Sequence, residues 1–495
     1  MRAFRPILAI VGVLVIALAQ IFIMALRVPS PLPAPARSFT LERVILTEPG
    51  QPQRGPVRVV VRDGLIASIE SVIAIEQAEA EPPEFVDAYV LPGFTDSHAH
   101  FPTLGLPGDA EFTSLLMLRH GVTRVRLVGG VDPSDLTRYR IRIRDGDAPG
   151  PLYFGCGPFI DGEDPILPGA HVVTNRQEAR RAVFALADQG VDCIKAYEML
   201  NRESAIALRE AAHERGLPVV GHTPRFVSFE DARFDDHQHL RGVHPPFENE
   251  RLEYPHFLRA WLRHGPERMA EVIRISLEYG IAHTPTLSAV DATLQAEDWA
   301  AWQRGNIMQQ WLPHARDGFW SADVGFNPVR FMGSDDFALI RQASKRQRET
   351  VKAFFDAGVP IHTGTDSNAP NLVPGASLHR ELRLLVEAGL TPDQALEAST
   401  KTSARFLGIP NAGQLRVGAP ADLLVFKENP TADLDALDTL VAVAAAGRFY
   451  RTNEIEDRLD RYREHYDGFA FNRGLMPILR TTLDLSTSLM DRPAH

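Results

Sequence analysis

The pattern of hydrophobic and polar positions divides the chain into three kinds of segment. Residues 6–26 are apolar almost throughout, with Gln20 as the only strongly polar side chain. Residues 39–90 and 410–455 carry short, β-like runs with turn signals between them. In residues 91–409, apolar strand-like runs alternate with amphipathic helical stretches. The pattern therefore predicts an α/β protein with a separate β-rich unit.

The alternation in the central segment is regular enough to predict its architecture. Strands that alternate with helices favour a parallel sheet, and eight of them favour a closed (β/α)8 TIM-like barrel over residues 91–409. We expect residues 39–90 and 410–455 to meet as one small β-sandwich, and 456–495 to form a C-terminal tail. The predicted barrel strands are 90–98, 122–130, 151–157, 191–197, 217–222, the stretch ending at 236–240, 281–287 and 359–366.

The apolar amino terminus is long enough to cross a bilayer, which takes about 20 residues as a helix. Two arginines precede it. We therefore expect residues 1–27 to be a transmembrane signal anchor that holds an extracytoplasmic, periplasmic catalytic part at the membrane. Residues 28–38, with proline at alternate positions, are expected to be an extended linker. A cleaved signal peptide with a secreted product, or a cytoplasmic orientation, are the alternatives left open.

Composition narrows the function classes. The chain has 495 residues and a net charge of −11, and it has no basic patch of the kind that binds nucleic acid. Its only cysteines, Cys156 and Cys193, are too few for a disulfide scaffold, and we expect both to be buried free thiols. Seventeen histidines raise the prospect of metal chemistry. The sequence leaves the oligomeric state open.

Histidines cluster where the predicted strands end, at the face where barrel enzymes carry their active sites. His98 and His100 are two positions apart, so an extended segment points both the same way and they can grip one metal ion. His237 and His239 form a second such pair, and chance pairs are expected among so many histidines. His222 ends the predicted strand 217–222, which lies in the sequence between these two pairs. Each could instead be a hydrogen-bonded barrel histidine.

Lys195 lies inside a predicted buried strand, Val-Asp-Cys-Ile-Lys-Ala-Tyr. Burial disfavours the ammonium form and lowers the pKa of a lysine. One interpretation is an ion pair with Asp192 or Glu198. The other is reaction of the neutral amine with CO2 to a carbamate anion that bridges two divalent metals. Asp366 ends the last predicted strand, where its carboxylate can bind a metal and accept a proton, or can cap a helix with Ser367.

These residues give the chain a resemblance to the amidohydrolase superfamily, in its binuclear subtype with a carbamylated lysine, over roughly residues 40–455. The likeness is strongest to imidazolonepropionase-like and Xaa-Pro dipeptidase-like members. The motifs are VLPGFTDSHAH, CIKAYE, VVGHTP, DHQHLRG, HTGTDS, a long helix from ASLHREL to SARFLG, and GQLRVGAPADLLVF. The resemblance implies that His98, His100 and Asp366 hold one metal, that His222 and His239 hold the second, and that Lys195 and a hydroxide bridge them.

The resemblance also suggests residues that contact the substrate. His171 matches a histidine that follows strand 3 in such members, and we expect it to act beside Asp366 in catalysis. Tyr197 and His237 are further candidates for holding the oxyanion or the substrate. Phe226 stands where some dipeptidases carry a tyrosine for the substrate carboxylate, which weakens the case for a dipeptide.

We therefore expect a hydrolase that uses a metal-activated hydroxide to cleave an amide or cyclic amide bond of a small-molecule amide or peptide-like substrate. Two divalent ions, with zinc favoured by the histidine ligands, lower the pKa of the bridging water. Asp366 serves as general base and then acid. An esterase, lactonase or phosphotriesterase on the same site, and a barrel without catalysis, remain alternatives. An insertion at 288–344, rich in tryptophan, is either a helical unit with its own core or a lid.

Overall fold

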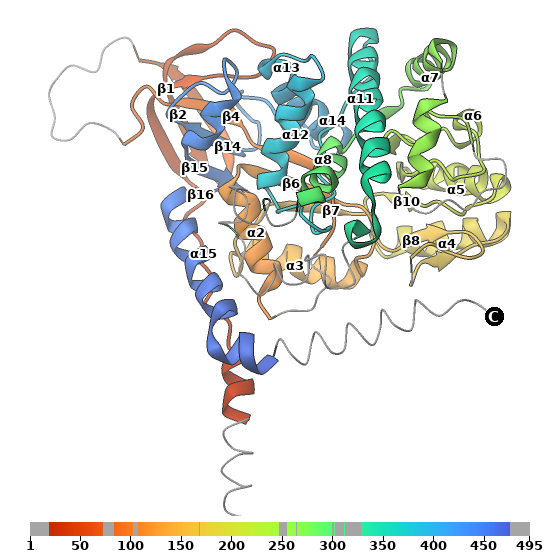
Figure 1. The fold of residues 1–495 in the computed structure, drawn as a ribbon. Coiled ribbons are helices and arrows are strands. Elements are labelled where there is room, and N and C mark those ends of the chain that lie inside the picture. Colours follow the sequence, from red (N-terminus) through yellow and green to blue (C-terminus); the bar gives the residue numbers. More distant parts are fainter. Residues whose placement is uncertain are drawn as a thin grey trace, which may run out of the picture.

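The protein is described by a computed structural model, shown as a ribbon in Figure 1. A β-sheet that joins both ends of the chain lies on one side, and a ring of strands with helices around it lies on the other (Figure 1). The described residues are 19–72, 84–101, 107–167, 169–246, 255–263, 265–298, 301, 311 and 328–475.

The sheet on the first side has seven strands, and alternate residues enter its core. In β2 (Arg54–Arg62), Val57, Val59 and Val61 are buried, while Arg58 between them is exposed and Val60 is half-buried, as expected for a sheet with one covered face. β4 pairs parallel with β1 and antiparallel with β14, which brings the two ends of the chain into one sheet. In order across the sheet the strands are β16 (Arg448–Arg451), β15 (Leu440–Ala445), β14 (Leu423–Phe426), β4 (Tyr89–Pro92), β1 (Phe39–Leu46), β2 and β3 (Leu65–Ser71).

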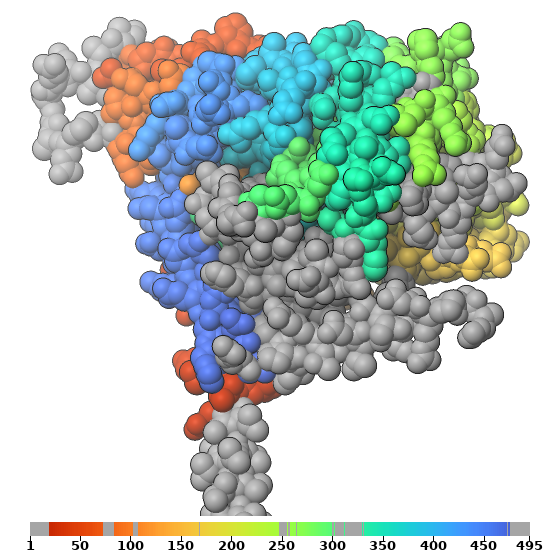
Figure 2. Space-filling model, viewed as in Figure 1, coloured from red at the N-terminus to blue at the C-terminus, as the bar shows by residue number. Residues whose placement is uncertain are grey.

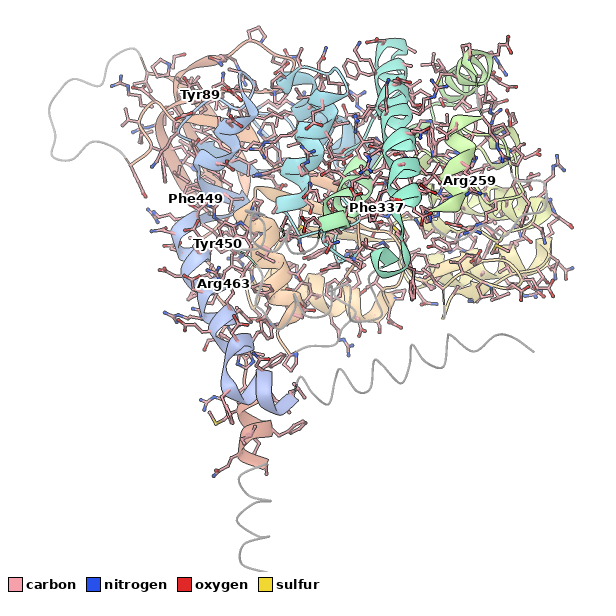
Figure 3. All side chains as sticks on the ribbon, viewed as in Figure 1. Tyr89, Arg259, Phe337, Phe449, Tyr450 and Arg463 are labelled. Carbon is pink, nitrogen blue, oxygen red and sulfur yellow. A yellow bond between two sulfur atoms is a disulfide. The ribbon has the colours of Figure 1, made fainter. Side chains whose placement is uncertain are left out.

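Aromatic side chains extend the core of this sheet at its edge. Phe449 on β16 contacts Phe39 on β1, with ring centroids 4.8 Å apart, and also Phe85. Figure 3 shows Tyr89, Phe449 and Tyr450 on the sheet, far across the molecule from Arg259. The sheet therefore has its own apolar core, distinct from the core between the ring and its helices.

The central strands form a parallel ring. A three-stranded sheet, β5-β6-β7, and a six-stranded sheet, β13-β12-β11-β10-β8-β9, make up most of it. Bridges from His283 to Ile361 and from Ala99 to Ser367 bring in residues 361–367 and close the ring. The strands are β5 (Phe94–Ala99), β6 (Val122–Leu127), β7 (Leu152–Gly155), β8 (Phe159–Asp161), β9 (His171–Val172), β10 (Ile194–Ala196), β11 (Val219–Gly221), β12 (Asp236–Gln238) and β13 (Ala282–Thr284).

Amphipathic helices cover the ring. In α4, Ala179, Ala182, Val183 and Leu186 lie on one face and share a core with the strands. The helices are α2 (Asp109–Arg119), α3 (Pro133–Asp145), α4 (Arg176–Asp188), α5 (Arg202–Glu214), α6 (Phe229–Ala232), α7 (Pro266–Tyr279), α8 (Leu287–Gln295), α11 (Ser334–Ala357), α12 (Ala376–Glu387), α13 (Pro392–Glu397), α14 (Ser403–Phe406), α15 (Thr452–Asp467) and the short turns η1 (His256–Leu262), η2 (Ala296–Asp298), η4 (Pro328–Phe331), η5 (Ala398–Thr402), η6 (Leu434–Thr439) and η7 (Ala470–Leu475).

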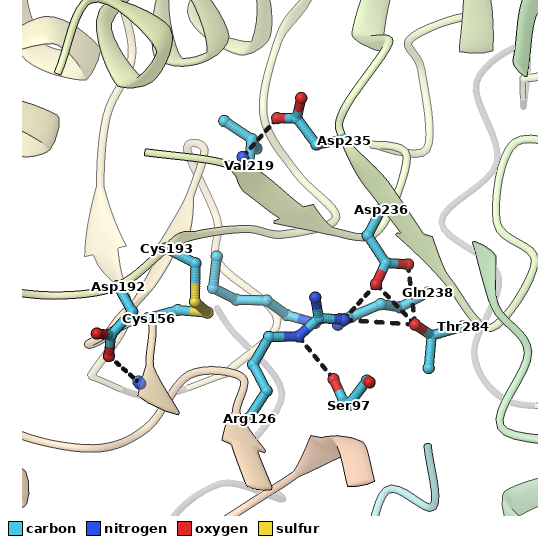
Figure 4. The surroundings of a disulfide bond; sticks show 12 residues. Ser97, Arg126, Cys156, Asp192, Cys193, Val219, Asp235, Asp236, Gln238 and Thr284 are labelled. Carbon is cyan, nitrogen blue, oxygen red and sulfur yellow. Dashed lines mark hydrogen bonds and ion pairs between the residues drawn. A yellow bond between two sulfur atoms is a disulfide. The ribbon is translucent and has the colours of Figure 1, made fainter. Parts of the chain in front are cut away.

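The two cysteines correct one expectation. Cys156 and Cys193 are both buried, as predicted, but they form a disulfide rather than two free thiols. Figure 4 shows the bond between the end of β7 and the start of β10. Across this junction the chain also has a backbone hydrogen bond from Asp192 to Gly155. The sequence hid the pairing because the two residues are 37 positions apart and only the closed ring brings them together.

The predicted membrane anchor is the part of the fold prediction that is wrong. No helix in the described part of the chain is both long and apolar enough to cross a membrane, so the transmembrane signal anchor and the extracytoplasmic, membrane-bound location drawn from it are not supported. The described helix at residues 19–26 is short, and Ala25 is buried with the core. Figure 2 shows it next to α15. Residues 1–18, with most of the apolar run, lie outside the described residues.

The tryptophan-rich insertion is described only in part. Trp299, Trp302 and Trp320 lie outside the described residues. Trp311 packs edge-on against His120, with ring centroids 5.1 Å apart, and Arg119 lies over its ring. This tryptophan therefore covers the outer side of α2, and the choice between a core unit and a lid stays open.

Candidate metal centre and active site

A cavity of about 320 Å³ opens where the strands of the ring end, and all six predicted metal ligands line it. His98 is on β5 and Lys195 on β10, while His222 and His239 follow β11 and β12 directly. The ring therefore gathers, from segments far apart in the sequence, His98, His100, Lys195, His222, His239 and Asp366.

His98, His100 and Asp366 form one tight group. The Nε2 atoms of the two histidines lie 3.2 and 2.9 Å from the same carboxylate oxygen of Asp366. One ligand atom from each of the three residues fits within 4.8 Å of the others, so this group can hold a metal ion. Asp366 has a positive φ of 64°, and its amide donates to the carbonyl of His98 at 2.7 Å, which fixes the turn that presents the carboxylate.

The electrostatics of this group suit metal binding. Burial lowers the pKa of His98 to about 3, so the ring is neutral and offers a lone pair. Burial alone would raise the pKa of Asp366, but His98 and His100 outweigh it and hold that pKa well below its ordinary value. The group thus combines imidazole rings, of which that of His98 is neutral, with an ionised carboxylate, the ligand types that zinc and similar divalent ions take.

Lys195 is fully buried beside this group. Burial lowers the pKa of its amine to about 7. Its Nζ donates to Oε1 of Gln238 and lies 5.7 Å from the ring centroid of Tyr197. Neither Asp192 nor Glu198 is its hydrogen-bond partner: Asp192 pairs with Arg140, and Glu198 pairs with arginines and His222. The ion-pair interpretation of this lysine is therefore not supported.

His222 and His239 stand side by side on the other side of the cavity, with ring centroids 4.8 Å apart. His222 donates through Nδ1 to Glu198 at 3.1 Å, because a carboxylate can only accept. His239 bonds through Nδ1 to the hydroxyl of Thr286 at 2.5 Å, and that hydroxyl donates to a carbonyl. Both rings therefore carry their proton on Nδ1, which leaves each Nε2 free to act as a ligand.

The structure separates His239 from the competing His237. His237 contacts the hydroxyl of Thr223 through Nδ1 at 2.6 Å and accepts the amide of Phe234 through Nε2 at 3.1 Å. It is buried against Phe229 and does not line the cavity. His239 leaves the strand with a positive φ of 55°, which turns its ring to the cavity. The preference for His239 as the ligand candidate therefore agrees with the geometry.

One expected contact, His171, and the departure at Phe226 both lie outside the cavity. His171 lies on the short strand β9, where it is exposed, and it is not among the residues that line the cavity. Phe226 is likewise exposed and outside the cavity. Tyr197 does line it, with its ring 4.6 Å from that of His222.

Several supporting residues were missed by the sequence interpretation. Asp236 is buried beneath the site, where it accepts hydrogen bonds from Arg126 and from Thr284 at 2.7 Å (Figure 4). It also accepts one from His362 at 3.0 Å. Arg126 also donates to the carbonyl of Ser97 at 2.7 Å. This network ties together the strands that carry the ligand candidates. A charged residue inside an apolar strand, as Arg126 in Val-Thr-Arg-Val-Arg-Leu, was the available signal.

A second missed cluster lies in the cavity wall. Glu198 accepts from Arg225 at 2.5 Å and from Arg241 at 3.0 Å, in addition to His222. Burial opposes ionisation of Glu198, but Arg241 and His222 outweigh it and hold its pKa well below the ordinary value. Glu198 therefore stays a carboxylate that fixes His222 and both guanidinium groups.

The chain is similar to known proteins over most of its length. The profile described as "Amidohydrolase family" matches residues 89–449. An imidazolonepropionase from Anaeromyxobacter dehalogenans is 26% identical over 343 residues, which cover 66% of this chain and 63% of that protein. An ochratoxinase from Aspergillus niger is 31% identical over 112 residues, 22% of each protein. These alignments thus span less than two thirds of the curated relatives.

A solved structure gives a more complete match. A bottromycin amidohydrolase superposes with a TM-score of 0.69 at 25% identity, over 92% of this chain and 96% of that one. The match takes in the seven-stranded sheet as well as the ring. The resemblance inferred from the sequence motifs, including the likeness to imidazolonepropionase, is confirmed.

Proposed function

Because the chain belongs to the amidohydrolase family, we propose that it is a metal-dependent hydrolase that cleaves an amide or cyclic amide bond in a small molecule. The observation that carries this proposal is the convergence of six ligand-type side chains on one cavity. A ring that served only as a scaffold would not need four histidines, an ionised aspartate and a buried lysine at the same opening.

In this proposal the site would hold two divalent ions, which we take to be zinc. His98, His100 and Asp366 would hold one, and His222 and His239 would hold the other. Lys195, as a carbamate, would supply a ligand to both. When bound, the ions polarise the scissile carbonyl and lower the pKa of an attacking water.

The environment of Lys195 supports the carbamate. A pKa of about 7 leaves much of the amine neutral near neutral pH, and only the neutral amine has the lone pair that attacks CO2. The neutral amine forms an N–C bond to CO2 and releases one proton, so the uncharged side chain becomes an anion. Gln238, which accepts from the amine, carries an Nε2 that lacks a hydrogen-bond partner among the described residues. Such an amide group is suited to donate to a carbamate oxygen.

Asp366 is the residue that moves the proton. Its ionised carboxylate faces the cavity, so it can accept a proton from the attacking water and pass it to the departing nitrogen. Glu198 and Thr286 keep the His222 and His239 rings oriented through their Nδ1 atoms. Leu258, Trp261 and other apolar residues form the far wall and exclude water from the reacting atoms.

The test is hydrolysis by the full chain loaded with zinc, manganese or cobalt. Metal content is measured by elemental analysis, and turnover is measured on N-acyl amino acids, dipeptides, cyclic imides, esters, lactones and phosphotriesters. We expect bound metal and turnover of at least one amide or cyclic amide. Bound metal with turnover restricted to esters, lactones or phosphotriesters would contradict the proposed reaction, and a chain that binds no metal would contradict the proposed site.

A further inference from the structure

Glu381 on α12 is a carboxyl group that the protein buries completely, outside the wall of the cavity. It therefore makes no contact with the space in which a substrate would lie. Burial raises its pKa to about 8, because its surroundings oppose the charged form. Any role of Glu381 in the site must act through the groups that it holds.

The groups that Glu381 holds are the first two amides of α8. Its Oε1 accepts from the amide of Leu287 at 3.1 Å, and its Oε2 accepts from the amide of Ser288 at 2.7 Å. The first amides of a helix have no partner within the helix itself. Thr286 is the N-cap residue and its side chain makes no cap hydrogen bond, so the carboxyl group from another helix takes that place.

The start of α8 also holds a ligand candidate. The hydroxyl of Thr286 contacts Nδ1 of His239 at 2.5 Å. Thr286 has a φ of 49°, a conformation that β-branched residues rarely adopt, so the surrounding structure must hold it there. The two amides that Glu381 accepts follow Thr286 directly, and their contacts fix its position.

The same turn of helix is joined to the ring of strands and to the cavity wall. The hydroxyl of Ser288 donates to the carbonyl of Thr365 at 3.3 Å, in the strand segment that closes the ring. Ala289, Val290 and Thr293 follow on α8 and line the cavity. A shift of the helix start would therefore move the cavity wall as well as the histidine ring.

Resting on the proposed function, we propose that Glu381 is a positioning residue for the ion that His222 and His239 would hold. Its carboxyl group fixes the start of α8, the helix start fixes the hydroxyl of Thr286, and this hydroxyl fixes the ring of His239. The ring then keeps its proton on Nδ1 and leaves Nε2 as the ligand atom. Glu381 thus orients an ion-binding ring from a different helix, without touching the ion.

A double-mutant cycle tests this series of contacts. Chelator competition on the zinc-loaded protein measures the affinity for each ion in the wild type, Glu381→Gln, Thr286→Val and the double variant, at pH 9, where the wild-type carboxyl group is ionised. Glutamine keeps the shape but has one acceptor oxygen in place of two, so we expect Glu381→Gln to weaken the binding of one ion about 10- to 100-fold. Because both residues act on the same ring, the double variant should lose little more than the larger single loss. Unchanged affinity in Glu381→Gln, or losses that multiply in the double variant, would overturn the assignment.

A matched control separates this role from a general loss of stability. Asp422 is also a buried carboxyl group, and it accepts from Arg124 at 2.8 Å and from the amide of Ala446 at 3.1 Å, outside the cavity wall. Asp422→Asn should therefore lower the free energy of unfolding and leave the affinity for both ions unchanged. Glu381→Asp, which keeps the charge and shortens the side chain, should weaken the same ion as Glu381→Gln, so the test stands even if the glutamine variant does not fold.

A measurement on the metal-free protein separates this inference from the proposed function. Histidine side-chain 15N NMR reports which ring nitrogen of His239 carries the proton, with His239→Asn to assign the signals. We expect Nδ1 to be protonated in the wild type and in Asp422→Asn, and both tautomers to be populated in Glu381→Gln. An unchanged tautomer in Glu381→Gln contradicts the positioning role, whether or not the protein binds metal. A changed tautomer in a protein that binds no metal supports the positioning of the ring and counts against the proposed site.

Discussion

His239 and Thr286 are joined by a hydrogen bond of 2.5 Å between the ring Nδ1 and the hydroxyl oxygen. Thr286 has a positive φ of 49° at the start of α8, and the carboxylate of Glu381 accepts the next two amides at 3.1 and 2.7 Å. The hydroxyl is thus held by the helix start and not by the histidine alone. This contact fixes the ring orientation that His239 needs as a ligand.

We predict that Thr286→Val lowers the affinity for one of the two metal ions about 10- to 100-fold. Valine keeps the shape and removes the acceptor for Nδ1–H, so the ring loses its fixed orientation. Chelator competition on the loaded protein measures the effect. Thr293→Val is the control, because Thr293 also lines the cavity from α8 but bonds only to the carbonyl of Ala289. Equal metal retention in both variants would contradict the role of Thr286.

Lys195→Ala tests the bridging carbamate. We predict that bound metal falls from about two ions per chain toward one or none, since the variant removes a ligand shared by both ions. Elemental analysis of the purified protein measures the stoichiometry. Lys352→Ala, on the exposed surface of α11 and paired with Asp356, should keep the wild-type content. Unchanged stoichiometry in Lys195→Ala would remove the bridging role.

The pKa of Lys195 also predicts a pH-dependent stability of the metal-free protein. Its folded pKa of about 7 lies below the ordinary value of 10.5, so folding is penalised as pH falls from about 10.5 to about 7 and the penalty is complete below 7. Lys195→Met removes a charge that the fold buries. We expect the metal-free variant to be more stable than the wild type at pH 7 by about 3 kcal/mol or more, with the difference shrinking toward pH 10. Urea unfolding at both pH values measures this, and a less stable variant at pH 7 would contradict it.

Much of the site could be predicted because its residues end strands of a regular alternating pattern. His98, Lys195, His222 and Asp366 each follow or end an apolar run, and parallel strands bring such ends to one face. The two-residue periodicity left His237 and His239 equivalent. They differ because His239 adopts a positive φ, and the neighbouring residues in the sequence do not predict this backbone conformation.

The differences have equally specific causes. His171 was placed by resemblance alone and stays a prediction; the short strand that carries it is the last strand of its sheet. Arg241 and Glu198 were missed because a charged pair across two strand ends has no characteristic spacing in the sequence. Glu198 had been considered only as a partner of Lys195. The apolar amino terminus was interpreted from length and hydropathy alone, and no helix in the described residues supports a membrane span.

The disulfide gives a prediction about stability. Cys156 and Cys193 close a loop of 37 positions, for which the loss of chain entropy corresponds to about 3 to 4 kcal/mol. We expect the free energy of unfolding of the double variant Cys156→Ser, Cys193→Ser to be lower than that of the wild type by an amount of this order. Denaturant unfolding of both proteins measures the difference. Thiol titration of the denatured, unreduced wild type should find no free thiol. Two reactive thiols per chain would show that the bond does not form.

Asp366→Asn separates proton transfer from metal binding. The amide can still offer an oxygen to a metal, but it cannot accept a proton at neutral pH, so we predict that kcat falls about 10²- to 10⁴-fold while most of the metal is retained. Asp356→Asn, at an exposed position on α11, should leave both unchanged.

The pKa of Asp366 lies well below its ordinary value, so its carboxylate remains ionised at pH 5. Loss of activity between pH 8 and pH 6 must then come from another group, and Lys195 and the buried Asp96, each with a pKa of about 7, titrate in that interval. If added bicarbonate restores activity at pH 6.5 in the wild type but not in Asp366→Asn, Lys195 and Asp366 have the separate roles assigned to them. Retention of more than about a tenth of kcat in Asp366→Asn would contradict the proton-transfer role of Asp366.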